Sequence, residues 1–508
     1  MHDSVAPSKE MPRQSVIWIT GAAIFALALT LAFVLLTRVD SFIGTDDYYH
    51  SRIAAQIVEQ GSLRLNFPWL PMTILSNDQF VDHHLLYHLY VAPFMAIGGI
   101  TGAKLAQSIV FGSIAVAFWS LLRTVKVRHA WLWSVGIVAV SAPFLYRMLM
   151  IRTQGTAVLL LLITLNILFQ RRYLWLILLA FAFTWLYNGF VLLPAIVGLY
   201  ALAAWITERR ILWRPVMYAF AGVALGLVIN PYFPQNMAFI IDHLGEKVDI
   251  GSNVRVGNEW YPYTTGELME NSLGALLALA AGILAGSFRK SARDHIETTV
   301  LLVALLTLYM VFRSRRFIEY YPIFALLFCA VAWGRSPVSW RNVLPDWMPS
   351  SVYRRAYPLI IALPIGVLSL FTVGQVHDDI QHVTDFDYMR GASVWLMENT
   401  EPGEMVFQTD WDDFTRLFFH NTHNTYLVGL DPTYLQVANP VLWNQWVAIT
   451  QGLVDRPSVL IQEMFDAKYV VSDNNHEAFS QDAESDPAMQ LVYQDEYSLI
   501  WLIHEASP

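Results

Sequence analysis

The feature that most limits how this chain can fold is a series of long apolar runs. Three of them, at 158–168, 174–183 and 301–312, contain no charged residue, and apolar flanks extend them toward the ~20 residues that cross a bilayer. Charged residues make up only 14% of the 508 residues, against roughly a quarter in soluble domains. The sequence therefore predicts a polytopic α-helical membrane protein.

Hydropathy predicts eleven membrane-spanning helices, at 16–37, 104–122, 130–146, 155–170, 173–188, 189–206, 215–230, 273–288, 296–312, 317–334 and 356–374. No small-residue cleavage site follows the first segment, so it is expected to be retained rather than removed as a signal peptide. Arginine and lysine concentrate in loops that share one side of this arrangement, at 123–128, 171–172, 209–214, 289–293 and 335–355. The positive-inside rule makes that side the cytoplasm and places the N-terminus inside. Parity further predicts that 85–100, although apolar, lies at the outer interface or re-enters the protein.

The same arrangement divides the chain into a transmembrane domain, 1–374, with outer loops at 38–103 and 231–272, and an extracytoplasmic domain, 375–508. The tail mixes helix-like stretches with short apolar runs, which predicts an α/β domain of ordinary size. The net charge of −9 argues against nucleic-acid binding, which requires a basic face. The single cysteine, Cys329, excludes an intrachain disulfide.

Two adjacent carboxylates, Asp46 and Asp47, follow the first predicted span within GTDDYYHSR, residues 44–52. A carboxylate at this place can hold a divalent cation, act as a base or orient an acceptor nucleophile. The alternative is a helix N-terminus, because aspartate is favoured there and helix-like sequence follows. The residues themselves leave both interpretations open.

A histidine-rich motif, DHHLLYH, follows at residues 82–88 of the same loop. His84 and His88 are four residues apart and would share one face of a helix that begins near Asp82. The motif fits a metal site, or a functional role for Asp82 or His83, but it also fits side chains that pack at the headgroup boundary. The absence of an H-E-x-x-H sequence argues against a zinc protease.

Short outer turns contain arginines that break the charge rule: Arg147, Arg152, Arg313, Arg315 and Arg316. Arginine pairs bidentately with phosphate oxygens, so a cluster at the headgroup plane suits a lipid phosphate. The alternatives are anchoring to lipid headgroups and an internal ion pair with Glu319.

Two further outer segments combine acidic and aromatic residues. Glu259, in NEWYPYTTGEL at 258–268, suits either a partly dry sugar site or an aromatic belt at the membrane interface. Trp411, Asp412 and Asp413 lie in the tail, where they suit binding of a polar acceptor or form a turn between elements.

The order of these motifs resembles the catalytic subunit of oligosaccharyltransferase, of the archaeal or bacterial type, within the GT-C superfamily of membrane glycosyltransferases. The acidic pair followed by YYHSR is similar to that family's first-loop motif. RSRRFIEYYPIF resembles its arginine–phenylalanine motif, and 395–414 resembles the stretch leading into its WWDYG signature. The resemblance covers most of the chain.

The resemblance implies transfer of a sugar or oligosaccharide from a polyprenyl-(pyro)phosphate donor to an acceptor on the outer side of the membrane. It implies Asp46 or Asp47 as the first-loop acid and Glu259 as the counterpart of the acidic residue in the family's long later loop. Arg316, with Arg315 nearby, would contact the donor phosphate.

A divalent metal, Mn²⁺ or Mg²⁺, belongs to the same set of implications. The turn that carries the family's second acidic motif holds Arg147 and Arg152 here and no aspartate. The expected ligands are therefore Asp47, Asp82 and His83.

This chain departs from the family at 410–414, where DWDDF stands in place of the WWDYG that reads an acceptor sequon. The acceptor is accordingly left open between a protein, a glycan and a lipid. The first loop also resembles protein O-mannosyltransferases and the lipid A aminoarabinose transferase, which use a monosaccharide on a polyprenyl monophosphate. Alternatives from other classes are a lipid-linked glycan transporter and a non-catalytic sensor. The expected location is a bacterial inner or archaeal plasma membrane, and the oligomeric state is left open.

Overall fold

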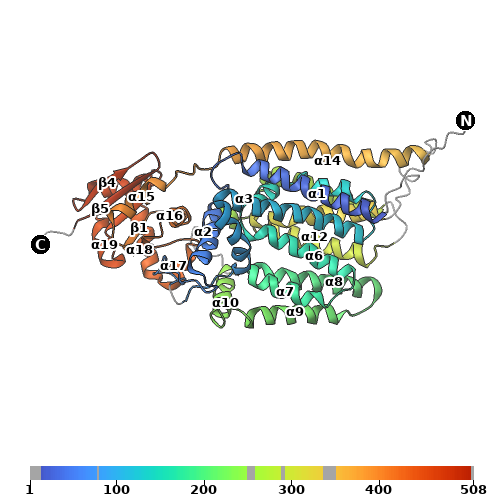
Figure 1. Cartoon of the computed structure of the whole chain (residues 1–508), viewed down its shortest axis with the longest axis horizontal. Coiled ribbons are helices and arrows are strands. Elements are labelled where there is room, and N and C mark those ends of the chain that lie inside the picture. Colours follow the sequence, from blue (N-terminus) through green and yellow to red (C-terminus); the bar gives the residue numbers. More distant parts are fainter. Residues whose placement is uncertain (1–12, 77–78, 249–257, 288–291, 336–349, 505–508) are drawn as a thin grey trace, which may run out of the picture.

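The computed structural model describes residues 13–76, 79–248, 258–287, 292–335 and 350–504. Long helices form a bundle, and a small domain that contains a β-sheet covers one end of it (Figure 1). The predicted architecture, a mostly helical protein with a small C-terminal α/β domain, is confirmed in this outline.

The bundle consists of α1 (Arg13–Leu36), α3 (Leu85–Thr124), α4 (Ala130–Val135), η2 (Gly136–Val138), α5 (Ala142–Leu149), α6 (Thr153–Phe169), α7 (Trp175–Leu186), α8 (Leu192–Glu208), α9 (Trp213–Val228), α11 (Thr265–Ser287), α12 (His295–Arg313), α13 (Tyr321–Gly334) and α14 (Ser350–Gln381). Within the described residues, six of these helices are long and apolar enough to cross a membrane. The α4–α5 pair, bent by 86°, would make a seventh, and α6, α7, α9 and α13 are apolar but shorter. Each predicted span coincides with such a helix, while the number and orientation of crossings stay predictions.

The apolar segment 85–98 forms the first arm of α3 and folds back on the second arm, 100–124. The Tyr90 hydroxyl donates to the carbonyl of Ala106 at 2.8 Å, although sixteen residues of straight helix span about 24 Å. The reversal occurs at Gly99, whose φ of 53° and ψ of −135° suit a glycine. This hairpin agrees with the expectation that 85–100 is not an ordinary span, and its depth in the membrane stays a prediction.

One end of the bundle carries α2 (Thr45–Gln60) and α10 (Gln235–Val248) and faces the sheet domain (Figure 1). The short helices η3 (Asn188–Val191), η4 (Asn258–Trp260) and η5 (Arg315–Glu319) join the long helices. The basic turns that follow α3, α6 and α8 lie at the opposite end. This separation agrees with the predicted sidedness but does not assign either end to a side of a membrane.

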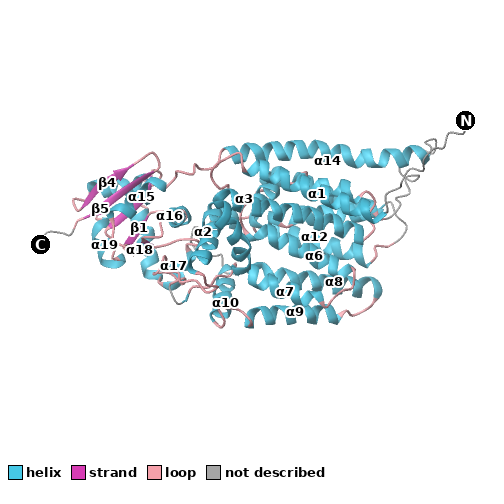
Figure 2. Ribbon diagram, in the orientation of Figure 1, coloured by secondary structure: helices cyan, strands magenta, loops and turns pink. Residues whose placement is uncertain are grey.

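The C-terminal domain contains α15 (Arg390–Asn399), β1 (Met405–Gln408), α16 (Phe414–His420), β2 (Thr425–Tyr426), α17 (Thr433–Ala438), α18 (Pro440–Thr450), α19 (Pro457–Phe465), β3 (Tyr469–Asp473), α20 (Glu477–Ser485), β4 (Met489–Gln494) and β5 (Ser498–Ile503). The strand order is β2-β1-β3-β5-β4. Figure 2 shows the strands of this domain in magenta, with helices around them. β1 is parallel to β2 and β3, whereas β5 is antiparallel to β3 and β4.

Both faces of the sheet are buried. Successive residues of a strand point to opposite sides, so neighbouring residues of β3 belong to different cores. Val470 belongs to a core with Trp446 of α18. Val471 belongs to a second core that also contains Phe418 of α16 and Tyr49 of α2. Because α2 shares a core with the sheet, the sheet domain is held against the end of the bundle.

Candidate functional site

A cavity of about 940 Å³ lies where the end of the bundle meets the sheet domain. Its helix-side wall comes from α2, the α5–α6 turn, η3, η4, the end of α12, and η5. Its domain-side wall consists of residues 411–412, 430–432 and 434. The predicted site residues that line it are Asp46, His83, Arg152, Glu259, Arg313, Arg316, Trp411 and Asp412. Those outside its lining are Asp47, Asp82, Arg147, Arg315 and Asp413.

The two adjacent aspartates have different roles at the start of α2. Gly44 is the extended residue before the helix, and its amide donates to Oδ2 of Asp47 at 3.1 Å. Asp47 is fully buried, which raises its pKa to about 8 despite the nearby Arg152. Asp46 faces the cavity and pairs with Arg152 at 2.9 Å. The helix-terminus interpretation thus fits Asp47, and the site interpretation fits Asp46.

Glu259 is the centre of an ion-pair network. Its Oε2 lies 3.2 Å from Arg147 and 3.8 Å from Arg152, and its Oε1 lies 2.9 Å from Arg316. Arg147 also pairs with Glu319 at 2.6 Å. Burial by itself would raise the pKa of Glu259, but Arg316, Arg152 and Arg147 outweigh burial and hold that pKa well below its usual range. Glu259 is therefore ionised at neutral pH.

Arg316, Arg315 and Arg313 diverge although they are close in sequence. The Arg316 guanidinium lies 4.8 Å above the ring of Trp260 and lines the cavity. Arg315 instead donates to the carbonyls of Tyr261 and Pro262, so it holds the loop after η4. Arg313 is exposed at the cavity, and within the described residues it forms no ion pair.

The domain-side wall is acidic and aromatic. Burial raises the pKa of Asp412 to about 6, and the negative charge of Asp46 adds to this. The backbone N–H of Asp412 donates to Oδ1 of Asp410 at 2.9 Å, which fixes the turn before α16. Asp413 is buried away from the cavity and accepts a hydrogen bond from Tyr388. Of the predicted acceptor residues, Trp411 and Asp412 therefore face the cavity and Asp413 does not.

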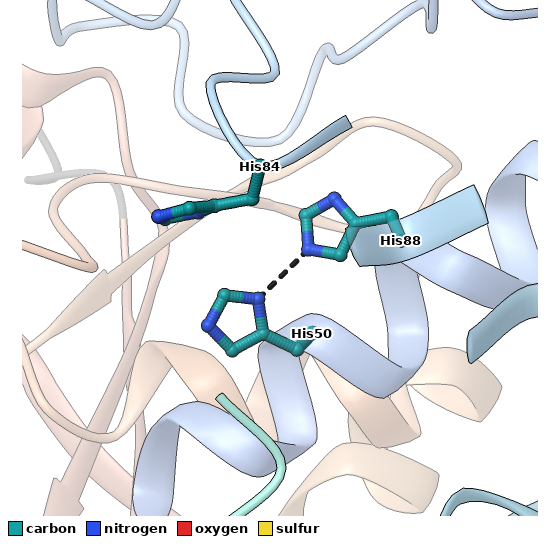
Figure 3. A group of neighbouring side chains, drawn as sticks. All are labelled: His50, His84 and His88. Atoms are coloured by element: carbon teal, nitrogen blue, oxygen red, sulfur yellow. Dashed lines mark hydrogen bonds between the residues drawn. The ribbon is translucent and has the colours of Figure 1, made fainter. Parts of the chain in front are cut away.

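Three histidines converge beside the cavity, His50 of α2 and His84 and His88 at the start of α3 (Figure 3). Nδ1 of His50 lies 2.8 Å from Nε2 of His88. Nδ1 of His88 lies 2.7 Å from Oδ2 of Asp82, whose Oδ1 accepts the backbone N–H of His84. Burial, followed by the neighbouring His88, lowers the pKa of His50 well below its ordinary value.

The predicted metal ligands do not fit a common ion. Asp47 caps α2, both oxygens of Asp82 already accept hydrogen bonds, and His83 stacks on Phe239 with ring centroids 4.9 Å apart. The two carboxylates of the helix-side wall, Asp46 and Glu259, are paired with Arg152 and Arg316. In the described part of the chain, ligand atoms of at least three His, Cys, Asp or Glu residues come within 4.8 Å of one another only at His50, His84 and His88. A hard cation such as Mn²⁺ or Mg²⁺, which prefers oxygen ligands, is not favoured by that set.

Several residues at the site were not singled out in the sequence. His50 lies inside GTDDYYHSR, but its partner His88 is 38 residues away. Tyr187, Trp260 and Tyr434 also line the cavity, and in the sequence nothing distinguishes them from the many other aromatic residues of the chain. No spacing rule reveals such contacts, because they depend on the packing of separate elements.

No protein-family model matches this chain, and no curated protein matches it in sequence. In fold it is similar to the archaeal oligosaccharyltransferase AglB from Archaeoglobus fulgidus in complex with an inhibitory peptide and a dolichol-phosphate, with a TM-score of 0.66 and 14% identity over 94% of this chain and 72% of that one. A complex of the A. fulgidus enzyme with Zn and sulfate gives a TM-score of 0.61 at 13% identity, over 95% of this chain and 73% of the enzyme. ArnT from Cupriavidus metallidurans bound to undecaprenyl phosphate gives 0.56 at 16% identity, over 96% of this chain and 98% of ArnT.

At identities of 13–16% these likenesses concern the fold. AglB and ArnT are both GT-C glycosyltransferases, so the resemblance predicted from the sequence motifs is confirmed at that level. This chain has the fold of the GT-C membrane glycosyltransferases.

Proposed function

We propose that this protein moves a sugar from a polyprenyl-phosphate donor to an acceptor bound in the cavity between the bundle and the sheet domain. The supporting observation is the opposite character of the two walls, with arginines on the helix side and Asp412 and Asp431 on the domain side. An anionic donor group is attracted to the first wall, and a hydroxyl or amine acceptor to the second. AglB and ArnT, which share the fold, have been solved with dolichol-phosphate and with undecaprenyl phosphate.

The charge of the helix-side wall favours a donor with one phosphate. The wall and its ion-pair network contain the arginines Arg147, Arg152, Arg313 and Arg316 and the carboxylates Asp46, Glu259 and Glu319. Four positive and three negative charges leave a net charge of +1. A sugar phosphodiester of a polyprenol carries one negative charge, whereas the pyrophosphate form carries two. A monophosphate donor, the alternative raised by the first-loop resemblance, therefore matches the net charge of the arginines and carboxylates of this wall.

In the proposed reaction, the donor phosphate lies against the arginines of the helix-side wall and the acceptor lies beside Asp412. The bond between the anomeric carbon and the phosphate oxygen breaks, its electron pair stays on the phosphate, and an acceptor oxygen or nitrogen forms the new bond. Arg316 and Arg313 are placed to stabilise the charge that develops on the leaving phosphate. The acceptor proton passes to Asp412, and attack from the face opposite the phosphate inverts the anomeric centre.

The rate of transfer is expected to depend on the ionisation of Asp412. A base works in its deprotonated form, so with a pKa of about 6 the rate should rise between pH 5 and pH 7 and then level off. Asp412→Asn should lower the rate by about 100-fold or more and remove that inflection. Asp413→Asn is the control, because Asp413 lies outside the cavity lining. An unchanged inflection in Asp412→Asn would assign the base to another group.

The direct test supplies the purified full-length protein with radiolabelled sugars on polyprenyl monophosphate and polyprenyl pyrophosphate. Sugar release and transfer are followed for wild type and Asp46→Asn, with added Mn²⁺ or with a chelator. We expect turnover of the monophosphate donor, no requirement for Mn²⁺, and a rate at least about tenfold lower in Asp46→Asn, because the pair with Arg152 is lost. Binding of these lipids without cleavage of either would contradict the proposal and favour a lipid-linked glycan transporter.

A further inference from the structure

The histidine cluster beside the cavity is not used by the proposed transfer. We propose that His50, His84 and His88 form a binding site for a transition-metal ion of the Zn²⁺ type, with Asp82 holding one of the ligands in place. The inference does not depend on the proposed function, because occupancy of the site can be measured without any sugar donor.

The first argument is convergence. One ligand atom from each of the three histidines lies within 4.8 Å of the others. His50 and His88 are buried, and the three rings come together from two separate elements (Figure 3). Two nitrogens bound to one tetrahedral Zn²⁺ lie ~3.4 Å apart, since each Zn–N bond is about 2.0–2.1 Å. The observed 2.8 Å between His50 and His88 therefore needs only a small separation of the two rings.

The second argument is the orientation of His88. Its Nδ1 lies 2.7 Å from Asp82 Oδ2, where it can donate only as an N–H, because the carboxylate accepts. This leaves the lone pair on Nε2, the atom that points at His50. A carboxylate that accepts from the outer nitrogen of a histidine is a recurrent partner of metal-binding histidines. Asp82 also accepts the backbone N–H of His84, so one carboxylate fixes two members of the cluster.

The ligand set indicates which ion is bound. Imidazole nitrogen suits Zn²⁺ and its transition-metal neighbours, whereas Mg²⁺ and Mn²⁺ prefer oxygen. Three protein ligands leave one position of a tetrahedral ion free. Because His50 and His84 also line the cavity, that position is available to an oxygen atom of a molecule bound there.

The test uses the full-length protein in detergent, stripped with a chelator and then incubated with ZnCl₂ or CoCl₂. We expect one Zn²⁺ per chain by elemental analysis and, with Co²⁺, visible absorption typical of a tetrahedral nitrogen site. His84→Ala should weaken Zn²⁺ binding by more than about 100-fold. Asp82→Asn should weaken it by about 10-fold to 100-fold without a matching change in thermal stability. An excess of Mg²⁺ should not displace the bound Zn²⁺.

His476→Ala is the matched control, because His476 belongs to a separate histidine–aspartate pair with Asp473 in the sheet domain. It should bind Zn²⁺ as the wild type does. Wild-type protein that takes up no stoichiometric Zn²⁺ would overturn the proposal even if every variant failed to fold. Full Zn²⁺ binding by His84→Ala, or loss of it in His476→Ala, would also overturn it. Sugar transfer by a metal-free protein would leave the proposed function intact, so the two proposals fail separately.

Discussion

Replacement of Arg316 by alanine is expected to slow sugar transfer by about 100-fold to 1,000-fold, the cost of removing one fixed group that stabilises developing charge. Arg316 lines the cavity, is held by Glu259 at 2.9 Å and lies over the ring of Trp260. Both contacts fix the guanidinium before the donor arrives, so little reorganisation accompanies the reaction. The effect should fall mainly on kcat, because the leaving phosphate gains charge in the transition state.

Two further variants separate this role from a general loss of positive charge. Arg316→Lys keeps the charge but loses the planar fork, so we expect an intermediate rate. Arg335→Ala is the matched control, because Arg335 pairs with Asp294 and lies outside the cavity lining. A transfer rate in Arg316→Ala within about twofold of that in Arg335→Ala would show that Arg316 does not act on the donor phosphate.

Glu259→Gln is expected to destabilise the protein by about 2 kcal/mol, less than the cost for a fully buried ion pair that loses one partner, because the Glu259 side chain is 23% exposed. Glu259 contacts Arg147, Arg152 and Arg316, so glutamine leaves three cations around an uncharged side chain. Those cations should then bind an added anion more tightly. Sulfate or polyprenyl phosphate should raise the thermal unfolding midpoint of the variant more than that of the wild type.

Glu267→Gln provides the comparison for this experiment. Glu267 pairs with Arg315 at 3.6 Å, but its side chain is 40% exposed, so solvent screens the pair. Its midpoint should stay close to that of the wild type and should not show an added response to sulfate. A Glu259→Gln protein that is as stable as Glu267→Gln would mean that the arginines are balanced in another way.

The sequence contains enough information to predict the membrane helices and the C-terminal domain. Uncharged apolar runs identify a bundle helix directly, because a helix that crosses the hydrocarbon core of a bilayer needs about 20 mostly apolar residues. Parity predicted that 85–100 is not an ordinary span, but the reversal of α3 was not predicted, since it depends on one residue, Gly99, within an apolar stretch. The bend of 86° between α4 and α5 was not predicted, because hydropathy treats 130–146 as one continuous apolar segment.

The individual site residues were harder to predict. Asp46 and Asp47 have the same chemistry, and a step of one residue on a helix turns a side chain by about 100°. Their different roles are set by the face that α2 presents to the cavity. The expected Mn²⁺ or Mg²⁺ ligands Asp47, Asp82 and His83 have chemically suitable types, yet within the described residues the structure does not bring their ligand atoms together.

The sequence by itself determined the class of protein, the positions of its helices and the residue types available for chemistry. Apolar runs and clusters of basic residues are continuous in the sequence, so the helices and their polar ends can be predicted without the tertiary structure. Only the tertiary structure decided which charges meet. Glu259 lies 112 residues from Arg147 and 57 from Arg316, and His50 lies 38 residues from His88. Contacts over such separations depend on how the helices and the sheet domain pack, because electrostatic and hydrogen-bond energies act over distances in space rather than along the chain.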